Sequence, residues 1–173
     1  MKTKRALVTV PTYNECKNIK ELVEQTMLCN DNHGLSIDLV IVDDNSPDGT
    51  GDIADDIAKN NKSVHVIHRS GKLGIGSAHL EGLKFGIKNG YDYLITMDAD
   101  FSHNPKYIPR LIVFMDDQDV VIGSRYIPGG DVEKCKISRK IISKLANMYI
   151  KNMLGFNVMD CTAGFRCYKR ELL

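Results

Sequence analysis

The sequence predicts an α/β domain whose central sheet is mainly parallel and flanked by helices. Short apolar segments alternate with segments of helical periodicity, an order that is typical of βαβ units. The segment 37–44 contains a continuous apolar run at 39–42, as expected of a strand that is covered on both faces. No repeat, low-complexity tract or linker interrupts the sequence, so residues 1–173 are expected to form a single domain.

Each expected strand is a short apolar run. The first, 5–10, ends at Pro11, and the second, 37–44, ends in two aspartates before the turn sequence NSPDGTG. A glycine-spaced loop follows the third strand, and a further pair of aspartates ends the fourth. In order, strands are expected at 5–10, 37–44, 63–68, 92–100, 119–124 and 164–168.

Apolar residues at helical spacing mark the expected helices between these strands. In the first helix they are Ile19, Leu22, Val23 and Met27, and Asn14 is expected to be its N-terminal cap. In order, helices are expected at 15–29, 50–60, 77–89, 105–116 and 138–152.

Composition excludes several classes of function. The 23 Lys and Arg nearly balance the 22 Asp and Glu, so no overall charge steers the chain toward nucleic acid, and no nucleic-acid partner is expected. The five cysteines include no C-x-x-C pair, which argues against a zinc site and fits a reducing, cytoplasmic setting. The apolar run before Pro11 is shorter than the roughly 7–15 residues of a signal peptide, and no run approaches the about 20 residues that span a bilayer.

Four polar clusters each follow an expected strand: 11–15, 43–49, 69–74 and 98–100. Ligands of open parallel sheets bind where the carboxyl ends of the strands meet. The agreement among four separate stretches therefore predicts one ligand site at that edge.

Asp98 and Asp100 are the candidate metal ligands. Residues two apart on a strand point to the same side, so both carboxylates can face one cation while Ala99 points away. Oxygen ligands favour Mg²⁺ or Mn²⁺, which share their coordination with substrate phosphates. His103 or Ser102 could complete the shell. The alternative is a solvated strand end that caps the next helix.

One of Asp43 and Asp44 is expected to face the pocket and to accept hydrogen bonds from a ribose or a base, because both end a buried strand. Asn45–Gly49 are expected to build the turn that follows.

A dinucleotide-binding fingerprint is incomplete in this chain. Gly74 and Gly76 give G-x-G, but His79 stands where the third glycine is required. A dehydrogenase is therefore not expected, and turn glycines are the simpler interpretation.

The segment 134–151 has six basic residues and no acidic one. Arg139, near the turn PGGD, is expected to bind phosphate, because an arginine fork matches phosphate oxygens. Lys144 and Lys151 are expected to be solvated on a surface helix. A basic amphipathic helix can also rest on anionic lipid headgroups.

Taken together, the motifs resemble those of dolichol-phosphate (polyprenol-phosphate) mannosyltransferases, which are inverting family-2 glycosyltransferases with the GT-A fold. The resemblance runs in the family's order from about residue 6 to the end of the chain. The motifs that carry it are VPTYNE, VDDNSPDGT, KLGIGSAHLEGLKFG, MDADFSHNP, GSRYIPGG, SRKIISKLAN and DCTAGFRCYKRELL.

The resemblance implies transfer of mannose from GDP-mannose to a polyprenyl (dolichyl) monophosphate, with Mg²⁺ or Mn²⁺ as cofactor. Two alternatives remain open. One is transfer from UDP-glucose, or another sugar nucleotide, to undecaprenyl phosphate. The other is a non-catalytic subunit that binds a nucleotide sugar.

The resemblance also implies roles for individual residues. Asp98 and Asp100 would hold the metal and its diphosphate, and Ala99 would lie beside the sugar nucleotide. Asp100, Arg139 and Asp160 are expected to take part in catalysis. The residues expected to contact the donor or its phosphates are Pro11, Tyr13, Glu15, Val42, Asp44, Asp98, Ala99, Arg125, Arg139, Arg166 and Arg170.

The chain departs from the family's pattern in three places. Ser102 stands where many relatives have a glutamine that serves as third metal ligand, and no tryptophan follows the GG turn. The chain stops at Leu173, where relatives continue, so it is expected to be truncated at its C-terminus. The resemblance implies a cytoplasmic protein that is peripheral at the cytosolic face of a membrane.

Overall fold

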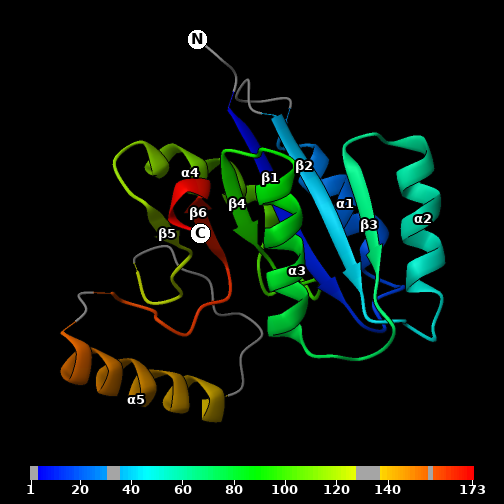
Figure 1. Cartoon of the computed structure of the whole chain (residues 1–173). Helices are drawn as coiled ribbons and strands as arrows, with labels where there is room; N and C mark the ends of the chain where they lie inside the picture. The colour runs from blue at the N-terminus through cyan, green and yellow to red at the C-terminus, as the bar shows by residue number, and fades with distance from the viewer. Residues whose placement is uncertain (1–3, 31–35, 128–136, 156–157) are drawn as a thin grey trace.

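A computed structural model describes residues 4–30, 36–127, 137–155 and 158–173. The sheet in these ranges has six strands in the order β3-β2-β1-β4-β6-β5 (Figure 1). Strands β3, β2, β1 and β4 are parallel, and β6 runs antiparallel to both β4 and β5. The predicted class, α/β with a mainly parallel sheet, is confirmed. The strands are β1 (Arg5–Thr12), β2 (Ser36–Asp43), β3 (Val64–His68), β4 (Tyr93–Thr96), β5 (Val120–Ile122) and β6 (Arg166–Lys169).

Helices cover both faces of the sheet. Helix α3 lies on one face, where its Ala78 packs with Leu7, Val40 and Leu94, and residues of α1, α2 and α4 pack on the other face (Figure 1). The helices are α1 (Ile19–Met27), α2 (Thr50–Asn60), α3 (Ile75–Lys88), α4 (Ile108–Val113) and α5 (Ile137–Leu154), with 3-10 helices η1 (Pro105–Tyr107), η2 (Phe114–Asp116) and η3 (Arg170–Leu172).

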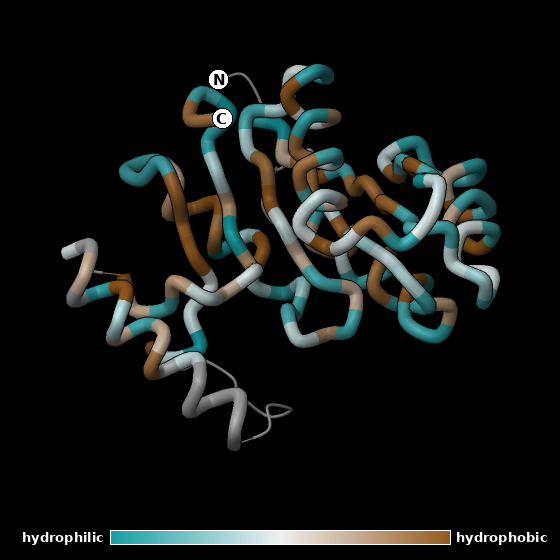
Figure 2. The backbone as a smooth tube through the Cα atoms, turned by 60° about the horizontal axis from the view of Figure 1, so that its bottom comes forward, coloured by the Kyte–Doolittle hydropathy of each residue, from teal (hydrophilic) through white to brown (hydrophobic). Residues whose placement is uncertain are grey.

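The central strands are buried on both faces, as the apolar run within the segment 37–44 predicts. Leu39 and Ile41 belong to the core under α1 and α2, whereas Val40 and Val42 belong to the core under α3. All four side chains are fully buried. In Figure 2 the hydrophobic colour follows the strands through the middle of the molecule. This packing fixes the strand ends from which the polar loops leave the sheet.

The fourth strand is shorter than the sequence predicts. The expected strand over 92–100 is wrong at its C-terminal end, because β4 stops at Thr96. The chain then bends, and Phe101 adopts a positive φ of 60°. Asp98 and Asp100 therefore lie in a loop, and the alternation of a strand does not set their directions.

Other boundaries also differ from expectation, and three of these differences have a local cause. β1 continues one residue past Pro11, since the fixed φ of proline is compatible with extended backbone. The Asn14 cap is wrong, because Asn14 has a positive φ of 64° in a turn and α1 begins only at Ile19. The helix expected at 105–116 is divided into η1, α4 and η2, with Pro109 in the first turn of α4, where it interrupts the hydrogen bonding.

The contact between α3 and the sheet predicts opposite effects for two glycines. A Cβ on Gly82 would overlap the Thr9 side chain, whereas a Cβ on Gly76 would meet no atom within 4 Å. Gly82→Ala is expected to lower the free energy of unfolding by about 1–3 kcal/mol through overpacking. Gly76→Ala is expected to raise it by up to about 1 kcal/mol. Urea denaturation followed by circular dichroism measures both, and equal stability of the variants would contradict the close contact.

Candidate active site

The carboxyl ends of β1, β2 and β4 and the loop after β3 line a cavity of about 1140 Å³. Tyr13 follows β1, Asp44 follows β2, Lys72 follows β3, and Asp98 and Asp100 follow β4. The four predicted clusters thus reach one cavity at the predicted edge of the sheet. Further polar lining comes from Glu15, Ser102, His103, Arg125, Ser143 and Thr162, and apolar lining from Leu111, Phe114, Val121, Ile127 and Phe165.

The loop after β1 is fastened to the start of α2. The backbone N–H of Glu15 donates to Thr50 Oγ1 at 2.9 Å. The Glu15 carboxylate accepts a hydrogen bond from Asn18 Nδ2 at 2.7 Å. These bonds hold Tyr13 and Glu15 at the cavity wall. Both are among the residues that are expected from the sequence to contact the sugar nucleotide.

The turn after β2 is built by the residues that the sequence predicts. Asn45 and Gly49 have positive φ values of 56° and 85°. Asp48 Oδ1 accepts from Thr50 Oγ1 at 2.6 Å, and this hydrogen bond lowers the pKa of Asp48. The turn is therefore stabilised by local polar contacts rather than by burial.

Of the two aspartates at the end of β2, Asp44 lines the cavity and Asp43 bonds within the turn. Asp44 Oδ1 lies 2.9 Å from Nε of the buried Arg69. Its Oδ2 accepts from the backbone N–H groups of Leu73 at 3.0 Å and Gly74 at 3.3 Å. Asp44 therefore fixes the loop after β3 at the cavity.

Asp98 lies between two imidazoles. Its Oδ1 is 3.6 Å from His79 Nε2, and its Oδ2 is 3.6 Å from His103 Nδ1. Burial raises the pKa of Asp98, but His79 and His103 more than offset this, so the pKa lies below its ordinary value. Burial lowers the pKa of His103, and its Nδ1 accepts the Asp98 N–H at 3.0 Å. Asp98 is therefore ionised at neutral pH.

The acidic loop after β4 has the chemistry to hold a divalent cation together with a ligand. The Asp98 side chain is 30% exposed and Asp100 is exposed, and both line the cavity. The described ranges contain no group of three or more His, Cys, Asp or Glu arranged to hold a metal ion. One or two carboxylates suffice for Mg²⁺ when substrate phosphates and waters supply the remaining ligands. These two residues fit such a shared site.

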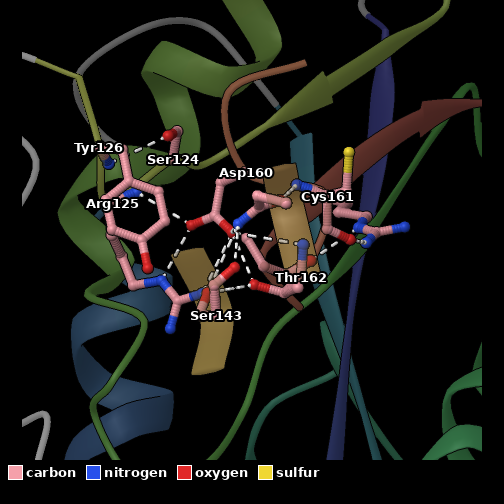
Figure 3. Close-up of polar contacts among 10 residues, drawn as sticks. Ser124, Arg125, Tyr126, Ser143, Asp160, Cys161 and Thr162 are labelled. Carbon is pink, nitrogen blue, oxygen red and sulfur yellow. Dashed lines mark hydrogen bonds and ion pairs between the residues drawn. The ribbon is translucent and has the colours of Figure 1, made fainter. Parts of the chain in front are cut away.

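Asp160 is fully buried and holds Arg125 at the cavity wall (Figure 3). Its Oδ2 accepts from Arg125 Nε at 2.9 Å, and its Oδ1 accepts from Arg125 Nη2 at 3.1 Å and Thr162 Oγ1 at 2.8 Å. Burial raises the pKa of Asp160, but the hydrogen bonds from Arg125 and Thr162 hold it below its ordinary value. Ser143 of α5 accepts from the same guanidinium at 3.3 Å, which joins α5 to this network.

Four of the predicted site residues whose side chains the structure describes do not line the cavity, and Val42 and Asp160 are the first two. The Val42 side chain is buried under α3, so it is removed from direct contact with a ligand there. Asp160 is also shielded, and it acts on the cavity through Arg125. Arg139 lies in α5, but its side chain is outside the part of the chain that the structure describes.

The last two predicted arginines also lie away from the cavity. Arg166 donates to the carbonyl oxygens of Ala163 at 2.7 Å and Cys161 at 2.6 Å, so it clamps the segment that carries Asp160. Arg170 follows β6, and its backbone N–H donates to the carbonyl oxygen of Asp92, just before β4. It therefore lies near the amino ends of the parallel strands, at the edge opposite the cavity.

Sequence reasoning does not single out Lys72, Arg69 or His79, which contact the predicted residues Tyr13, Asp44 and Asp98. The predicted cluster 69–74 contains Lys72 and Arg69, and its place after a strand is the signal that could identify them. The partnership of Arg69 and Asp44 follows from the parallel register in which Asp43 pairs with His68. A single sequence does not reveal such a register, so this pair was not predictable.

One side of α5 exposes apolar side chains. Leu145, Met148, Tyr149 and Met153 are between 54% and 65% exposed. By helical spacing, the first three lie opposite Ser143, which joins the Arg125 network. Among the helices in the described ranges, none is long and apolar enough to cross a bilayer.

The sheet order and the acidic cavity at the carboxyl edge define an α/β protein of the open-sheet class, with a candidate ligand site where the parallel strands end. The chain belongs to glycosyl transferase family 2, whose family model matches residues 7–173. Solved structures share the fold, which is the expected GT-A fold. A mannosyl-3-phosphoglycerate synthase from Rubrobacter xylanophilus superposes with a TM-score of 0.72 at 18% identity, covering 98% of this chain and 55% of that one. A mannosyltransferase from Pyrobaculum calidifontis in complex with GDP-Man and Mn²⁺ gives 0.65 at 19% identity, covering 99% and 46%.

Two curated relatives are much more similar in sequence. A polyprenol monophosphomannose synthase from Mycolicibacterium smegmatis is 44% identical over 99% of this chain. An undecaprenyl-phosphate mannosyltransferase from Micrococcus luteus is 43% identical over 98% of it. The chain spans 64% of the length of the first relative and 68% of the second.

The ion pair of the buried Asp160 with the partly exposed Arg125 predicts a pH-dependent stability. Asp160→Asn is expected to lower the free energy of unfolding at pH 7 by about 3 kcal/mol, because the Arg125 guanidinium loses the negative charge of its buried acceptor. The folded-state pKa is depressed from the ordinary 3.8, so the stabilisation is present above that pH and is lost as the pH falls through the lower folded pKa. Wild type and variant should therefore converge in acid.

The matched control is Asp119→Asn, since Asp119 is 73% exposed in its pair with Lys169. This change is expected to cost at most about 1 kcal/mol. Denaturant titrations at several pH values measure both variants. A constant difference between wild type and Asp160→Asn down to strongly acidic pH would refute the assigned ionisation.

Proposed function

We propose that the complete protein transfers mannose from GDP-mannose to a polyprenyl (dolichyl) monophosphate with inversion, giving polyprenyl-phosphate mannose. The observation that carries the proposal is the meeting of Tyr13, Asp98, Asp100 and Arg125 in one cavity. It is supported by 43–44% identity to two relatives whose names describe mannosyl transfer to polyprenols.

The donor would extend along the carboxyl edge of the sheet. The Tyr13 ring offers a flat aromatic surface to a base, and Glu15 and Asp44 lie near it on the cavity wall. At the next strand, Asp98 and Asp100 would hold Mg²⁺ or Mn²⁺ together with the donor diphosphate, and Ala99 lies between them. When bound, the metal offsets the charge that builds on the departing nucleoside diphosphate.

Arg125 is suited to bind the acceptor phosphate. Asp160 fixes its guanidinium, and its side chain is 33% exposed on the cavity wall. Because its Nε and Nη2 groups donate to Asp160, Arg125 would attract the phosphate through the positive charge of its guanidinium at the cavity wall, and Arg139 would be a second cationic ligand. Asp160 is then a positioning residue rather than a group that transfers a proton.

The chemistry requires no strong base. A polyprenyl monophosphate is already anionic at neutral pH, so its oxygen can attack the anomeric carbon directly. The new carbon–oxygen bond forms on the face opposite the departing nucleoside diphosphate, and the old one breaks, which inverts the anomeric centre. Positioning of the two phosphates by Arg125 and the acidic loop supplies much of the rate.

A lipid acceptor requires contact with a membrane surface, and α5 is suited to it. Its exposed apolar residues Leu145, Met148 and Tyr149 lie on one side of the helix, and the segment 134–151 is basic. An amphipathic helix with these properties binds the interface of an anionic bilayer. The same helix reaches Arg125 through Ser143, which would bring the phosphate headgroup to the cavity.

Asp100→Ala is expected to abolish metal-dependent donor binding while leaving the fold intact. We expect the Kd of GDP-mannose with Mn²⁺ to rise at least about tenfold, since even the loss of an outer-shell partner has this effect on metal sites. Isothermal titration calorimetry measures it, with Asp52→Ala on the exposed surface of α2 as the control. Unchanged binding by Asp100→Ala would refute the assignment of the metal ligand.

Titration of the wild-type chain with GDP-mannose and UDP-glucose tests the donor. We expect tighter binding of GDP-mannose, and the reverse preference would favour the UDP-glucose alternative. A chain extended to the length of its relatives that binds GDP-mannose but forms no polyprenyl-phosphate sugar would instead be a non-catalytic subunit.

Replacing Met148 and Tyr149 with glutamine is expected to reduce co-sedimentation with phosphatidylglycerol vesicles severalfold. The change removes exposed apolar area without adding charge, so a loss reports hydrophobic contact. The matched control replaces Leu80 and Ile87, which are also exposed apolar residues but lie on α3. Equal losses for both double variants would argue against membrane contact through α5.

A further inference from the structure

We infer that Lys72 is a specificity-determining residue of the donor site: its ammonium, which lies over the Tyr13 ring in this structure, swings to the edge of that ring when a guanine stacks there and donates a hydrogen bond to the acceptor edge of the base. This inference rests on the proposed function. It adds a residue to the donor site and a reason for the choice of base.

Lys72 is held at the cavity by its loop, although the residue is exposed. Its next neighbours, Leu73 and Gly74, donate their backbone N–H groups to Asp44 Oδ2. The other carboxylate oxygen of Asp44 lies 2.9 Å from Nε of Arg69, and both side chains are nearly completely buried. A buried ion pair thus anchors the loop, and the backbone of Lys72 needs no rearrangement to reach a ligand.

The Lys72 side chain already lies on an aromatic surface. Its Nζ is 4.2 Å from the centroid of the Tyr13 ring, within the range of an attractive cation–π contact. Within the described ranges no carboxylate lies within ion-pair distance of Lys72, whereas the lysines at 4, 59 and 169 each pair with an aspartate. Lys72 therefore brings a positive charge to the cavity without a protein counter-charge.

The order of the strands places Lys72 at the base end of a bound nucleotide. Tyr13, Asp44 and Lys72 follow β1, β2 and β3, whereas the acidic pair follows β4 on the other side of β1. A nucleoside diphosphate whose phosphates lie at Asp98 and Asp100 therefore directs its base toward Lys72. Aromatic side chains bind bases by stacking, and Tyr13 is the aromatic surface in this loop cluster.

The acceptor edge of the base decides what an ammonium recognises. Guanine presents N7 and O6, which are both acceptors, whereas adenine presents N7 beside an amino donor. A lysine has donors only. Lys72 therefore favours guanine over adenine, and a contact with the phosphates would favour neither.

The test compares GDP with ADP, each in the presence of Mn²⁺, using calorimetry for GDP and displacement of GDP for ADP. Lys72→Met is expected to raise the Kd of GDP by about tenfold, the effect of one hydrogen bond to a charged group, and to leave the Kd of ADP within twofold. Lys72→Arg keeps the charge and the donors and should retain most of the GDP affinity. Lys84→Met, an exposed lysine on α3 outside the cavity, is the matched control and should change neither.

Each outcome decides the inference. Equal loss of GDP and ADP affinity in Lys72→Met would place the ammonium at the phosphates. No loss of affinity would remove Lys72 from the site. Either result overturns base recognition by Lys72 and leaves the proposed function intact. Failure of the wild-type chain to bind GDP with Mn²⁺ would instead overturn the proposed donor, and base recognition by Lys72 with it.

Discussion

The parallel pairing of β1 with β2 on one side and β4 on the other is the constraint on which the rest of the structure depends. Val8 pairs with Leu39 across one ladder and with Ile95 across the other, and all three are fully buried. A shift of one residue in either ladder would turn buried side chains toward the wrong face. Hydrophobic burial therefore fixes the register, and the register brings the loops of Tyr13 and Asp44 beside the acidic loop after β4. The polar site is positioned by apolar packing below it.

The acidic residues at this edge divide into two groups. Asp43, Asp44 and Asp160 are buried, and their oxygens accept from protein donors or lie beside a guanidinium. Asp98 and Asp100 keep exposed oxygens in the cavity. Because burying an unpaired charge is costly, each member of the first group meets a protein partner. Asp43 and Asp160 accept hydrogen bonds, and Asp44 accepts from backbone through Oδ2 while its Oδ1 is balanced by the Arg69 charge without a well-formed hydrogen bond. These carboxylates set the geometry of the loops, and the second group is left to meet a ligand.

The α/β class, the helix at 50–60 and the shared edge of the polar clusters were predictable, because each depends on local periodicity or on a general property of parallel sheets. The end of β4 was not predictable, since the apolar residues after Thr96 continue the pattern of a strand although the chain has already bent. The placement of Arg166 and Arg170 depends on the antiparallel insertion of β6 beside β4, which no local pattern encodes. The resemblance of motifs indicates a role for both arginines in the site. It does not reveal that Arg166 bonds the loop before β6, or that Arg170 lies next to Asp92 at the start of β4.

β6 separates β4 from β5 in the sheet, although β5 ends at Ile122 and β6 begins only at Arg166. At translation rates of 5–20 residues per second, roughly 2–9 seconds pass between the synthesis of the two strands. In the described sheet β5 pairs with no strand other than β6, and Arg125 meets its buried partner Asp160 equally late. During that interval a nascent chain has an open β4 edge and a β5 strand that lacks its partner. Unpaired strand edges are prone to aggregation, so this half of the sheet is exposed to mispairing until β6 is made.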